Sequence, residues 1–372
     1  MKKYQYLILI FILISCSTTT ESVDNISEKE NAKVTTTTAL SNNTSSDSTS
    51  TSISIEDDYS FDKEKMSPFT GLELPPEIWL KRPRRVLSFK IDNNLNARPQ
   101  SGLEDSDSVY EILVEGGMTR FLAFFYDKTS SYLGPIRSAR PTDPTIVRPY
   151  GGVLIVSGAT PGLVPQIREL GVPVLEEQSP PAMFRINNRS APHNLYSDTE
   201  LVREIIDSKG FAFNPPPGPI YTFGLNQENW ESGAKRVTIK YSEFTTIIWK
   251  LDGETYSRFI IDGYSKSEDP VAHNTINRDE EMKIIQTETI AIIQGPIYVD
   301  EATTLPSVLT VGVGPVYLFN NGNYIEGTWR RNDITEPFEF YDAQQNSIFV
   351  PPSKQWVHIL PLEQGEVLWA DS

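Results

Sequence analysis

Cysteine and histidine are scarce in this sequence of 372 residues. The single cysteine cannot form an intramolecular disulfide or a thiolate metal cage. The three histidines, His193, His273 and His358, stand far apart and lack the paired spacing of metal ligands. Gly312 and Gly314 lie in a predicted hairpin, without the helix that a nucleotide loop requires. The sequence therefore predicts no metal site and no cofactor.

Basic residues are the minority charge. The chain has 33 Lys and Arg against 49 Asp and Glu, a formal net charge of −16. Binding to nucleic acid requires a basic face that neutralises phosphates, so this composition argues against a nucleic-acid partner. Arginine clusters therefore need a local explanation. The clearest cluster is "LGPIRSARPTD" (133–143), which holds Arg137 and Arg140 between prolines.

Long apolar runs are absent beyond the first residues. "YQYLILIFILIS" (4–15) follows two lysines and is too short to span a bilayer comfortably. Its end, "LISC" (13–16), resembles the bacterial lipobox, in which the cysteine is lipidated. That resemblance implies a signal peptide at 1–15, lipid on Cys16, and a protein held on the extracytoplasmic face of a bacterial membrane. A soluble signal peptide and a lone membrane helix are the alternatives.

Residues 16–60 are rich in Ser, Thr and acidic residues and have almost no aromatic residues. Such a segment buries too little apolar surface to fold, so we expect a disordered tether between the lipid and a folded body.

An α/β domain is predicted over 66–212, with a mixed sheet and helices. Four runs are β-prone: 84–92, 107–115, 120–127 and 152–158. One helix should start with Thr160 as its N-cap and Pro161 as its first residue. A second should start at Ser197, which forms a capping box with Glu200, and should stop at Gly210.

A mostly antiparallel β domain is predicted over 220–372, after the proline-rich "FNPPPGP" (213–219). Helical patterns nearly vanish there, and short β-prone runs alternate with glycine turns. "NNGN" (320–323) indicates a hairpin. Because proline resists both helix and central strand, we expect the two domains to have separate cores.

Nine residues of the first domain are candidates for binding an anion or another ligand. They are Asp92, Arg98, Asp107, Glu111, Glu115, Arg120, Arg137, Arg140 and His193. In one interpretation they form internal salt bridges, which arginine suits because its planar fork satisfies several acceptors. In the other they converge on a phosphate or carboxylate. Spacing alone favours the first interpretation.

Three of these positions carry more specific expectations. Arg137 and Arg140 should contact carboxylates or carbonyl groups of residues 92–120, and at least one should face a concave surface. His193 is either a general base or a structural hydrogen-bonding group, and its position in a loop favours the structural role. "VSGATPG" (156–162) places Thr160 where a hydrolase has its nucleophile, but a helix cap explains the same pattern.

The motifs together resemble the YerB-like bacterial lipoprotein family, which is named for a domain of unknown function. They are "PFTGLEL" (68–74), residues 82–125, "GPIRSARP" (134–141), "APHNLY" (191–196), "LFNNGNYIEGTWRR" (318–331) and "VPPSKQWVHILP" (350–361). The resemblance implies a lipid-anchored envelope protein with an α/β first domain and a β-rich second domain. It implies no established reaction. Ser106 and Thr160 depart from the alanine and serine expected there.

A looser resemblance, in residue order and type, is to the LytR-CpsA-Psr envelope transferases, which bind polyprenyl pyrophosphates through arginines. It would place five residues at the ligand: Asp92, Arg98, Asp107, Arg137 and Arg140.

Two hypotheses for the function follow. The first is a non-enzymatic, lipid-anchored envelope protein that binds an envelope protein or an anionic envelope ligand. The second is a metal-assisted phosphoryl or glycosyl-phosphate transferase. Arginines that line one open cleft would favour the enzyme, whereas arginines buried against their own carbonyl groups and carboxylates would favour the scaffold.

Overall fold

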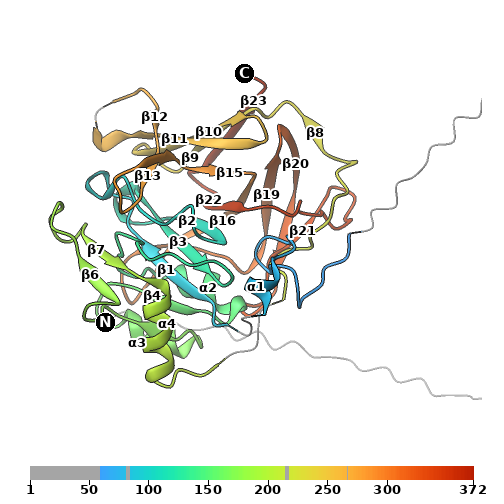
Figure 1. Ribbon diagram of the computed structural model, residues 1–372. Helices are drawn as coiled ribbons and strands as arrows, with labels where there is room; N and C mark the ends of the chain where they lie inside the picture. Colours follow the sequence, from blue (N-terminus) through green and yellow to red (C-terminus); the bar gives the residue numbers. More distant parts are fainter. Residues whose placement is uncertain (1–58, 81–83, 214–217, 266) are drawn as a thin grey trace, which may run out of the picture. The chain divides into compact units, whose positions relative to one another are not determined.

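A computed structural model describes residues 59–80, 84–213, 218–265 and 267–372. The signal peptide, Cys16 and nearly all of the predicted tether lie outside these residues. The described part is mostly sheet with few helices (Figure 1).

One mixed sheet of 11 strands organises the molecule. In sheet order its strands are β21 (Glu339–Tyr341), β20 (Asn323–Arg331), β19 (Gly312–Asn320), β16 (Thr289–Gly295), β22 (Gln355–Pro361), β2 (Ser108–Leu113), β3 (Thr119–Phe125), β1 (Leu87–Ile91), β4 (Val153–Ile155) and β5 (Val174–Leu175), and β8 (Glu231–Ser232) pairs with β20. The two parts of the chain join in this sheet where β2 and β22 pair in parallel, from Val109 opposite Trp356 to Ile112 opposite Ile359.

Seven strands of this sheet, β20, β16, β22, β2, β1, β4 and β5, run in the same direction, with β19 antiparallel between β20 and β16 and β3 antiparallel between β2 and β1. Their carboxyl ends therefore lie along one edge, which we call the carboxyl edge. In sheets with parallel strands, ligand-binding loops gather at such an edge.

A second sheet of six strands is antiparallel and covers part of one face of the large sheet (Figure 1). Its strands are β12 (Val271–Ala272), β11 (Thr255–Asp262), β10 (Thr245–Asp252), β9 (Arg236–Lys240), β23 (Glu366–Ala370) and β15 (Gln286–Thr287). Buried aromatic side chains fill the interface, with Trp249 of β10 set edge-on against Trp356 of β22 at a centroid distance of 5.5 Å.

Three short hairpins complete the sheets. They pair β6 (Met183–Arg185) with β7 (Leu195–Ser197), β13 (Asn274–Ile276) with β14 (Met282–Ile284), and β17 (Ile297–Val299) with β18 (Pro306–Val308).

Four α-helices are short: α1 (Pro76–Trp79), α2 (Asp143–Val147), α3 (Leu163–Glu169) and α4 (Thr199–Ser208). Leu163 and Ile167 of α3 belong to the core on one face of the large sheet. Val202 and Ile206 of α4 belong to the core on the other face.

The expectation of two separately cored domains is wrong. Ile55–Ser372 cluster as one compact unit, and each of the two core clusters draws residues from both parts of the chain. The physical reason is the pairing of β2 with β22, which makes the interior strands of both parts neighbours in one sheet.

Two helix starts also differ from expectation. The N-cap of α4 is Asp198, whose carboxylate accepts from the backbone N–H groups of Glu200 and Leu201. Ser197 is instead the buried last residue of β7, and its hydroxyl donates to the carbonyl of Ala182. Helix α3 begins at Leu163, after Gly162 at φ +87°, so Thr160 is not its cap.

The predicted turns are confirmed. Asn321 and Gly322 join β19 to β20 with φ of 46° and 77°, the paired positive values of a tight hairpin. Gly116 and Gly117, between β2 and β3, also have positive φ. Gly210 follows α4 with φ of 68°. The described residues include no helix with the length and apolar character needed to span a membrane.

Candidate functional site

Six of the nine predicted site residues meet at the carboxyl edge, and we call them the carboxyl-edge cluster. They are Asp92, Glu115, Arg120, Arg137, Arg140 and His193. Asp92 directly follows β1, and Glu115 lies two residues after β2. Arg120 is near the start of β3, which runs the opposite way and so begins at the same edge.

Residues 133–143, which we call the arginine loop, are hydrogen-bonded on one side to β1 and on the other to β7. The backbone N–H of Arg137 donates to the carbonyl of Lys90 at 2.8 Å, and that of Asp92 donates to Pro135 at 2.9 Å. On its other side, the N–H of Ile136 donates to Leu195 of β7 at 2.6 Å. This pairing brings Arg137 beside Asp92 and beside His193, two residues before Leu195.

Asp92 is the centre of the first half of the cluster. Its side chain is 3% exposed, and its Oδ2 lies 2.7 Å from His193 Nδ1 and 3.1 Å from Arg137 Nε. Its Oδ1 accepts the backbone N–H of Asn94 at 3.1 Å. Because a carboxylate only accepts, Nδ1 of His193 carries the proton of that contact.

Glu115 is the centre of the second half. Arg140 binds it through both edges of a fork, with Nε 2.6 Å from Oε2 and Nη2 on Oε1. Arg120 Nη2 lies 3.5 Å from Oε1. Burial raises the pKa of Glu115, but Arg140, with further help from Arg120, outweighs it and brings the pKa to about 2. Burial, reinforced by Arg140, lowers the pKa of Arg120 to about 10.

Backbone carbonyl groups accept further hydrogen bonds from the two buried arginines. Arg120 Nη1 donates to Ser138 O at 2.8 Å, and Arg140 Nη1 donates to Ala139 O at 2.7 Å. Both acceptors lie in the arginine loop itself. The loop is therefore held by its own Arg140 and by Arg120 of β3.

A buried ion pair that the sequence did not reveal lies next to the cluster. Lys90 of β1 and Asp143 of α2 are 2.6 Å apart, and both side chains have no exposed surface. Burial lowers the pKa of Lys90 to about 8, although Asp143 opposes the shift. Asp143 also accepts the backbone N–H of Arg140 at 2.7 Å. A lysine in the apolar run of β1 signals that a partner is needed, but not which one.

Glu111 lies elsewhere, sealed between the two sheets. Arg258 of β11 donates from Nη2 to both of its carboxylate oxygens at 2.7 Å, and neither side chain is exposed. Thr119 and Trp356 donate to the same carboxylate at 2.7 and 3.1 Å. Burial raises the pKa of Glu111, but Arg258 outweighs it and lowers the pKa below its usual value.

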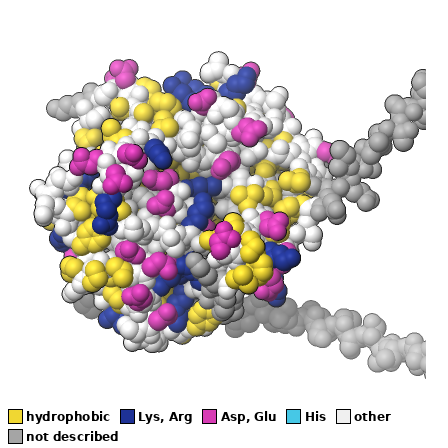
Figure 2. Space-filling model, in the orientation of Figure 1, with side chains coloured by type: hydrophobic (Ala, Val, Ile, Leu, Met, Phe, Trp, Pro, Cys, Tyr) yellow, Lys and Arg dark blue, Asp and Glu magenta, His cyan; other side chains and the backbone are white. Residues whose placement is uncertain are grey.

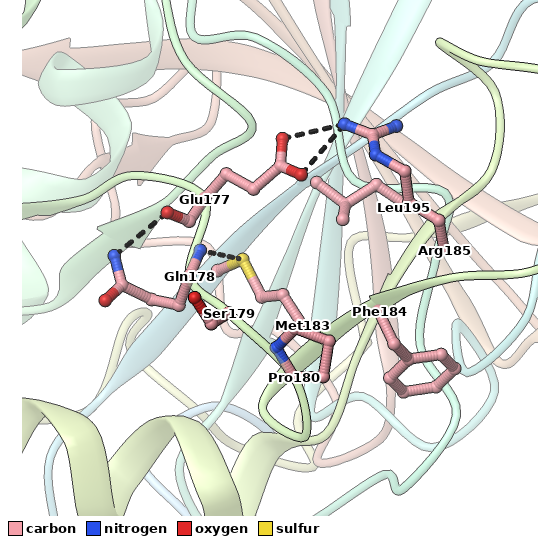
Figure 3. Close-up of a pocket in the computed structure, with 8 residues that line it drawn as sticks. All are labelled: Glu177, Gln178, Ser179, Pro180, Met183, Phe184, Arg185 and Leu195. Carbon is pink, nitrogen blue, oxygen red and sulfur yellow. Dashed lines mark hydrogen bonds and ion pairs between the residues drawn. The ribbon is translucent and has the colours of Figure 1, made fainter.

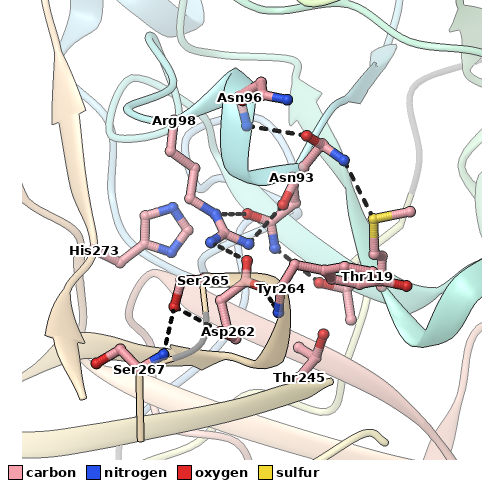
Figure 4. A network of polar contacts seen from close by, with 12 residues as sticks. Asn93, Asn96, Arg98, Thr119, Thr245, Asp262, Tyr264, Ser265, Ser267 and His273 are labelled. Carbon is pink, nitrogen blue, oxygen red and sulfur yellow. Dashed lines mark hydrogen bonds and ion pairs between the residues drawn. The ribbon is translucent and has the colours of Figure 1, made fainter. Parts of the chain in front are cut away.

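Arg98 belongs to the same inter-sheet network (Figure 4). Its Nη1 donates to Asp262 Oδ2 and its Nη2 to the Asn93 carbonyl, both at 2.6 Å. His273 joins the two ends of the network, with Nδ1 2.8 Å from Arg258 Nη1 and Nε2 2.8 Å from Gln100 Oε1. Burial and Arg258 hold the pKa of His273 well below its usual value, so it accepts from the arginine.

Asp107 lies at the opposite edge of the sheet. Its Oδ2 accepts backbone N–H groups of Tyr126, Asp127 and Lys128 at 2.6, 3.1 and 3.3 Å. Burial, with the nearby charge of Asp127, raises its pKa to about 6. The length of β3, at about 3.3 Å per residue, separates it from Asp92.

Two hollows open at the carboxyl edge. One of about 480 Å³ lies beyond β5, where Glu177 and Arg185 form an ion pair at its rim (Figure 3). The other, of about 700 Å³, is lined by Glu115, Phe244, Ile297 and nine further residues, which include Gly116 and Gly117. On the face drawn in Figure 2, acidic and basic side chains are interspersed and form no large patch of one sign.

The contact prediction for the arginine loop is confirmed, since Arg137 reaches Asp92 and Arg140 reaches Glu115. The five-residue arrangement drawn from the transferase resemblance is not formed, because Arg98 pairs with Asp262 of the second sheet and Asp107 accepts from the far end of β3. Whether any of these residues holds a ligand stays a prediction.

Fold and site together define a class: a sheet-rich protein in which two sequence segments share one large sheet, with paired arginines at its carboxyl edge. The chain belongs to the family of proteins of unknown function called DUF3048. The model of the N-terminal domain of that family matches residues 69–212, and the model of the C-terminal domain matches 237–357.

Two comparisons with individual proteins agree. The chain is 26% identical over 305 residues to "Putative lipoprotein YerB" of Bacillus subtilis, covering 80% of this chain and 87% of that protein. The crystal structure of YerB protein from Bacillus subtilis superimposes with a TM-score of 0.68 at 23% identity, over 82% of this chain and 99% of that one. The structural likeness extends the shared fold through nearly all of the solved chain.

Proposed function

We propose that this protein is a lipid-anchored scaffold on the extracytoplasmic face of a bacterial membrane, which binds an anionic ligand of the envelope through the carboxyl-edge cluster and catalyses no reaction. The anchor is supported by the lipobox-like "LISC" (13–16) and by the likeness to the relative named "Putative lipoprotein YerB".

The observation that carries the binding role is the way the arginines are held. Arg120, Arg137 and Arg140 each have a carboxylate partner, and Arg120 and Arg140 also donate to carbonyl groups of the arginine loop. Such pairing fixes the guanidinium groups in place before a ligand arrives, which lowers the entropy lost on binding. It favours a preorganised scaffold over an open catalytic cleft.

Charge supports the same proposal. Three guanidinium groups in the cluster face two carboxylates, Asp92 and Glu115, which leaves a positive excess when His193 is neutral. The neighbouring Lys90 and Asp143 cancel each other. In a chain with a formal net charge of −16, a local positive excess at one sheet edge attracts an anion to that edge.

Membrane fractionation tests the anchor. Replacement of Cys16 by alanine should move the protein from the membrane fraction to the soluble or unprocessed fraction. Equal membrane retention of the wild-type protein and the C16A variant would refute the lipid anchor.

Co-sedimentation with sacculi purified from Bacillus subtilis tests the ligand. The wild-type protein should sediment with intact sacculi and much less with sacculi stripped of their anionic polymers, and R137Q should weaken the binding. R185Q is a matched control, because Arg185 is also paired with a carboxylate, that of Glu177, but lies outside the cluster. Equal binding by wild type, R137Q and R185Q would refute the role of the cluster.

A further inference from the structure

Two donor groups of the carboxyl-edge cluster remain without partners among the described residues. Arg137 forms an ion pair with Asp92, with Nε 3.1 Å from Oδ2, and the hydrogen bonds of the described residues include none from its Nε or its two Nη atoms. Nδ1 of His193 contacts the same carboxylate, and its Nε2 has no partner among these residues. The two side chains are 22% and 17% exposed, so both reach solvent.

The carboxylate of Asp92 holds the side chains of Arg137 and His193 in place. One oxygen of its buried carboxylate binds both Arg137 and His193, so the guanidinium and the imidazole lie side by side. Its other oxygen and its backbone carbonyl are occupied by Asn94 and Gln100. The aspartate therefore orients the pair and has no role left in direct contact with a ligand.

We propose that Arg137 and His193 form a phosphoryl-binding centre, in which the Nη groups of Arg137 and Nε2 of His193 hold the oxygens of a phosphate group while Asp92 positions both. This inference rests on the proposed function and narrows its ligand from an anion to a phosphoryl group. A guanidinium fork matches two phosphate oxygens, and the imidazole supplies a donor to a third.

Charge distinguishes phosphoryl from carboxylate ligands here. A carboxylate is satisfied by the fork of Arg137 alone. A phosphate dianion attracts a second positive charge, and His193 provides it by taking a proton on Nε2, because Nδ1 already holds one. The proton comes from solvent, so binding of the dianion to the neutral imidazole is coupled to proton uptake.

The charged groups nearest to His193 are Asp92, whose Oδ2 lies 2.7 Å from its Nδ1, and Arg137, which is paired with the same oxygen. Arg189, on the same loop, is directed away and donates to the carbonyl groups of Ala97 and Pro99 at 2.6 Å.

Calorimetry of the full-length lipidated protein in detergent, with inorganic phosphate as the probe, tests the centre. At pH 8 imidazoles are generally neutral, so the heat of binding should depend on the ionisation enthalpy of the buffer, as proton uptake requires. Acetate should bind, if at all, without that dependence. Phosphate binding with no buffer dependence, or no phosphate binding at all, would overturn the inference.

Variants separate the two groups. R137K should weaken phosphate binding about tenfold or more, because lysine lacks the fork. H193Q should abolish proton uptake while leaving weaker binding, since glutamine retains a hydrogen bond to Asp92. R185K should bind phosphate like the wild type. Equal phosphate affinity of wild type, R137K and H193Q would overturn the assignment, and thermal melts confirm that each variant is folded.

Histidine NMR gives a readout that needs no variant. His273 and His358 are 2% and 0% exposed, so phosphate should shift one imidazole signal of the three, that of the partly exposed His193. A phosphate titration that moves a different signal, or none, would refute the centre. Acetate binding that depends on Arg137 without any phosphate binding would refute the phosphoryl inference alone, whereas sacculus binding unchanged in R137Q refutes the proposed function.

Discussion

Individual residues of this protein show a consistent way of burying charge. Lys90 and Asp143 have no exposed side-chain surface, and neither have Glu111 and Arg258, yet each finds its opposite charge within 2.7 Å. An isolated buried charge costs several kcal/mol. The attraction within such a pair therefore stabilises the fold less than removal of one partner would destabilise it. The partners come from distant parts of the sequence.

Replacement of Glu111 by glutamine should destabilise the protein strongly. Arg258 would keep its charge, buried among Phe121, Trp249 and Trp356, without a carboxylate. We expect a loss of about 3–5 kcal/mol in the free energy of unfolding, measured with urea. E177Q is the control, because the exposed pair of Glu177 with Arg185 should contribute about 1 kcal/mol or less. Similar losses in both variants would contradict a special role for the inter-sheet pair.

Asp107 should make stability fall as pH rises. Its pKa is raised from 3.8 to about 6 in the folded protein, so the fold prefers the protonated form. The stability that it contributes is complete below pH 4 and is lost as pH rises through 6. At about 1.4 kcal/mol per pKa unit, the loss is roughly 3 kcal/mol.

Urea unfolding of wild type and D107N between pH 4 and 7 measures this effect. The stability of the wild type relative to D107N should fall over that range, since asparagine does not titrate. The D252N variant of an exposed aspartate reports the background change. A wild-type to D107N difference that stays constant with pH would contradict the raised pKa.

At the scale of elements, turns are determined locally and helix boundaries are not. Asn321-Gly322 and Gly116-Gly117 form the expected turns because glycine accepts positive φ without a steric penalty. The start of α4 moved by one residue because Ser197 pairs in β7 and is buried, which leaves Asp198 free to cap. Tertiary pairing thus decides between two adjacent residues that are both good caps.

Replacement of Gly322 by alanine should weaken the hairpin of β19 and β20. A side chain at φ of 77° is strained, and its Cβ would lie 3.2 Å from Leu251 Cδ2. We expect a loss of about 1–2 kcal/mol in the free energy of unfolding. Gly218 is the matched control, since a Cβ there meets nothing within 4 Å and its φ is not positive. Equal stability of G322A and G218A would show that the turn does not limit the fold.

The molecule as a whole is built around a sheet to which both sequence domains contribute. β2 lies between β3 of its own segment and β22 of the other. Separation of the segments would leave β2 and β22 as unpaired edges with apolar faces, which favours aggregation over folding. The proline-rich junction therefore lies between the two regions that the family models match, but each core cluster draws residues from both sides of it.

Residues 59–372 should accordingly unfold in one cooperative transition. Tryptophan fluorescence and far-UV circular dichroism should give coincident urea curves, as two-state unfolding requires. A chain cleaved by protease near residues 213–220 should keep both fragments together on a sizing column. Two separate transitions, or fragments that fold independently when expressed alone, would contradict the shared sheet.

Much of the local structure was predictable from the sequence. The runs at 84–92, 107–115 and 120–127 became β1, β2 and β3, since alternation and β-branched residues act within a few positions. The contacts of Arg137 and Arg140 with carboxylates of the 92–120 region were predicted as well. Lys90 and Asp143 were missed as a pair, because nothing in the sequence marks α2 as the neighbour of β1.

The sequence by itself determined the strands, the glycine turns and the lipobox-like start, because each depends on the conformational preference or chemistry of a few adjacent residues. Only the tertiary structure decided which charges meet. It separated Asp92 from Asp107 by the length of β3, although the two are 15 positions apart in a single polar region of the sequence. It also joined β2 to β22, because strand pairing depends on which edges meet in space and carries no signal at a fixed spacing.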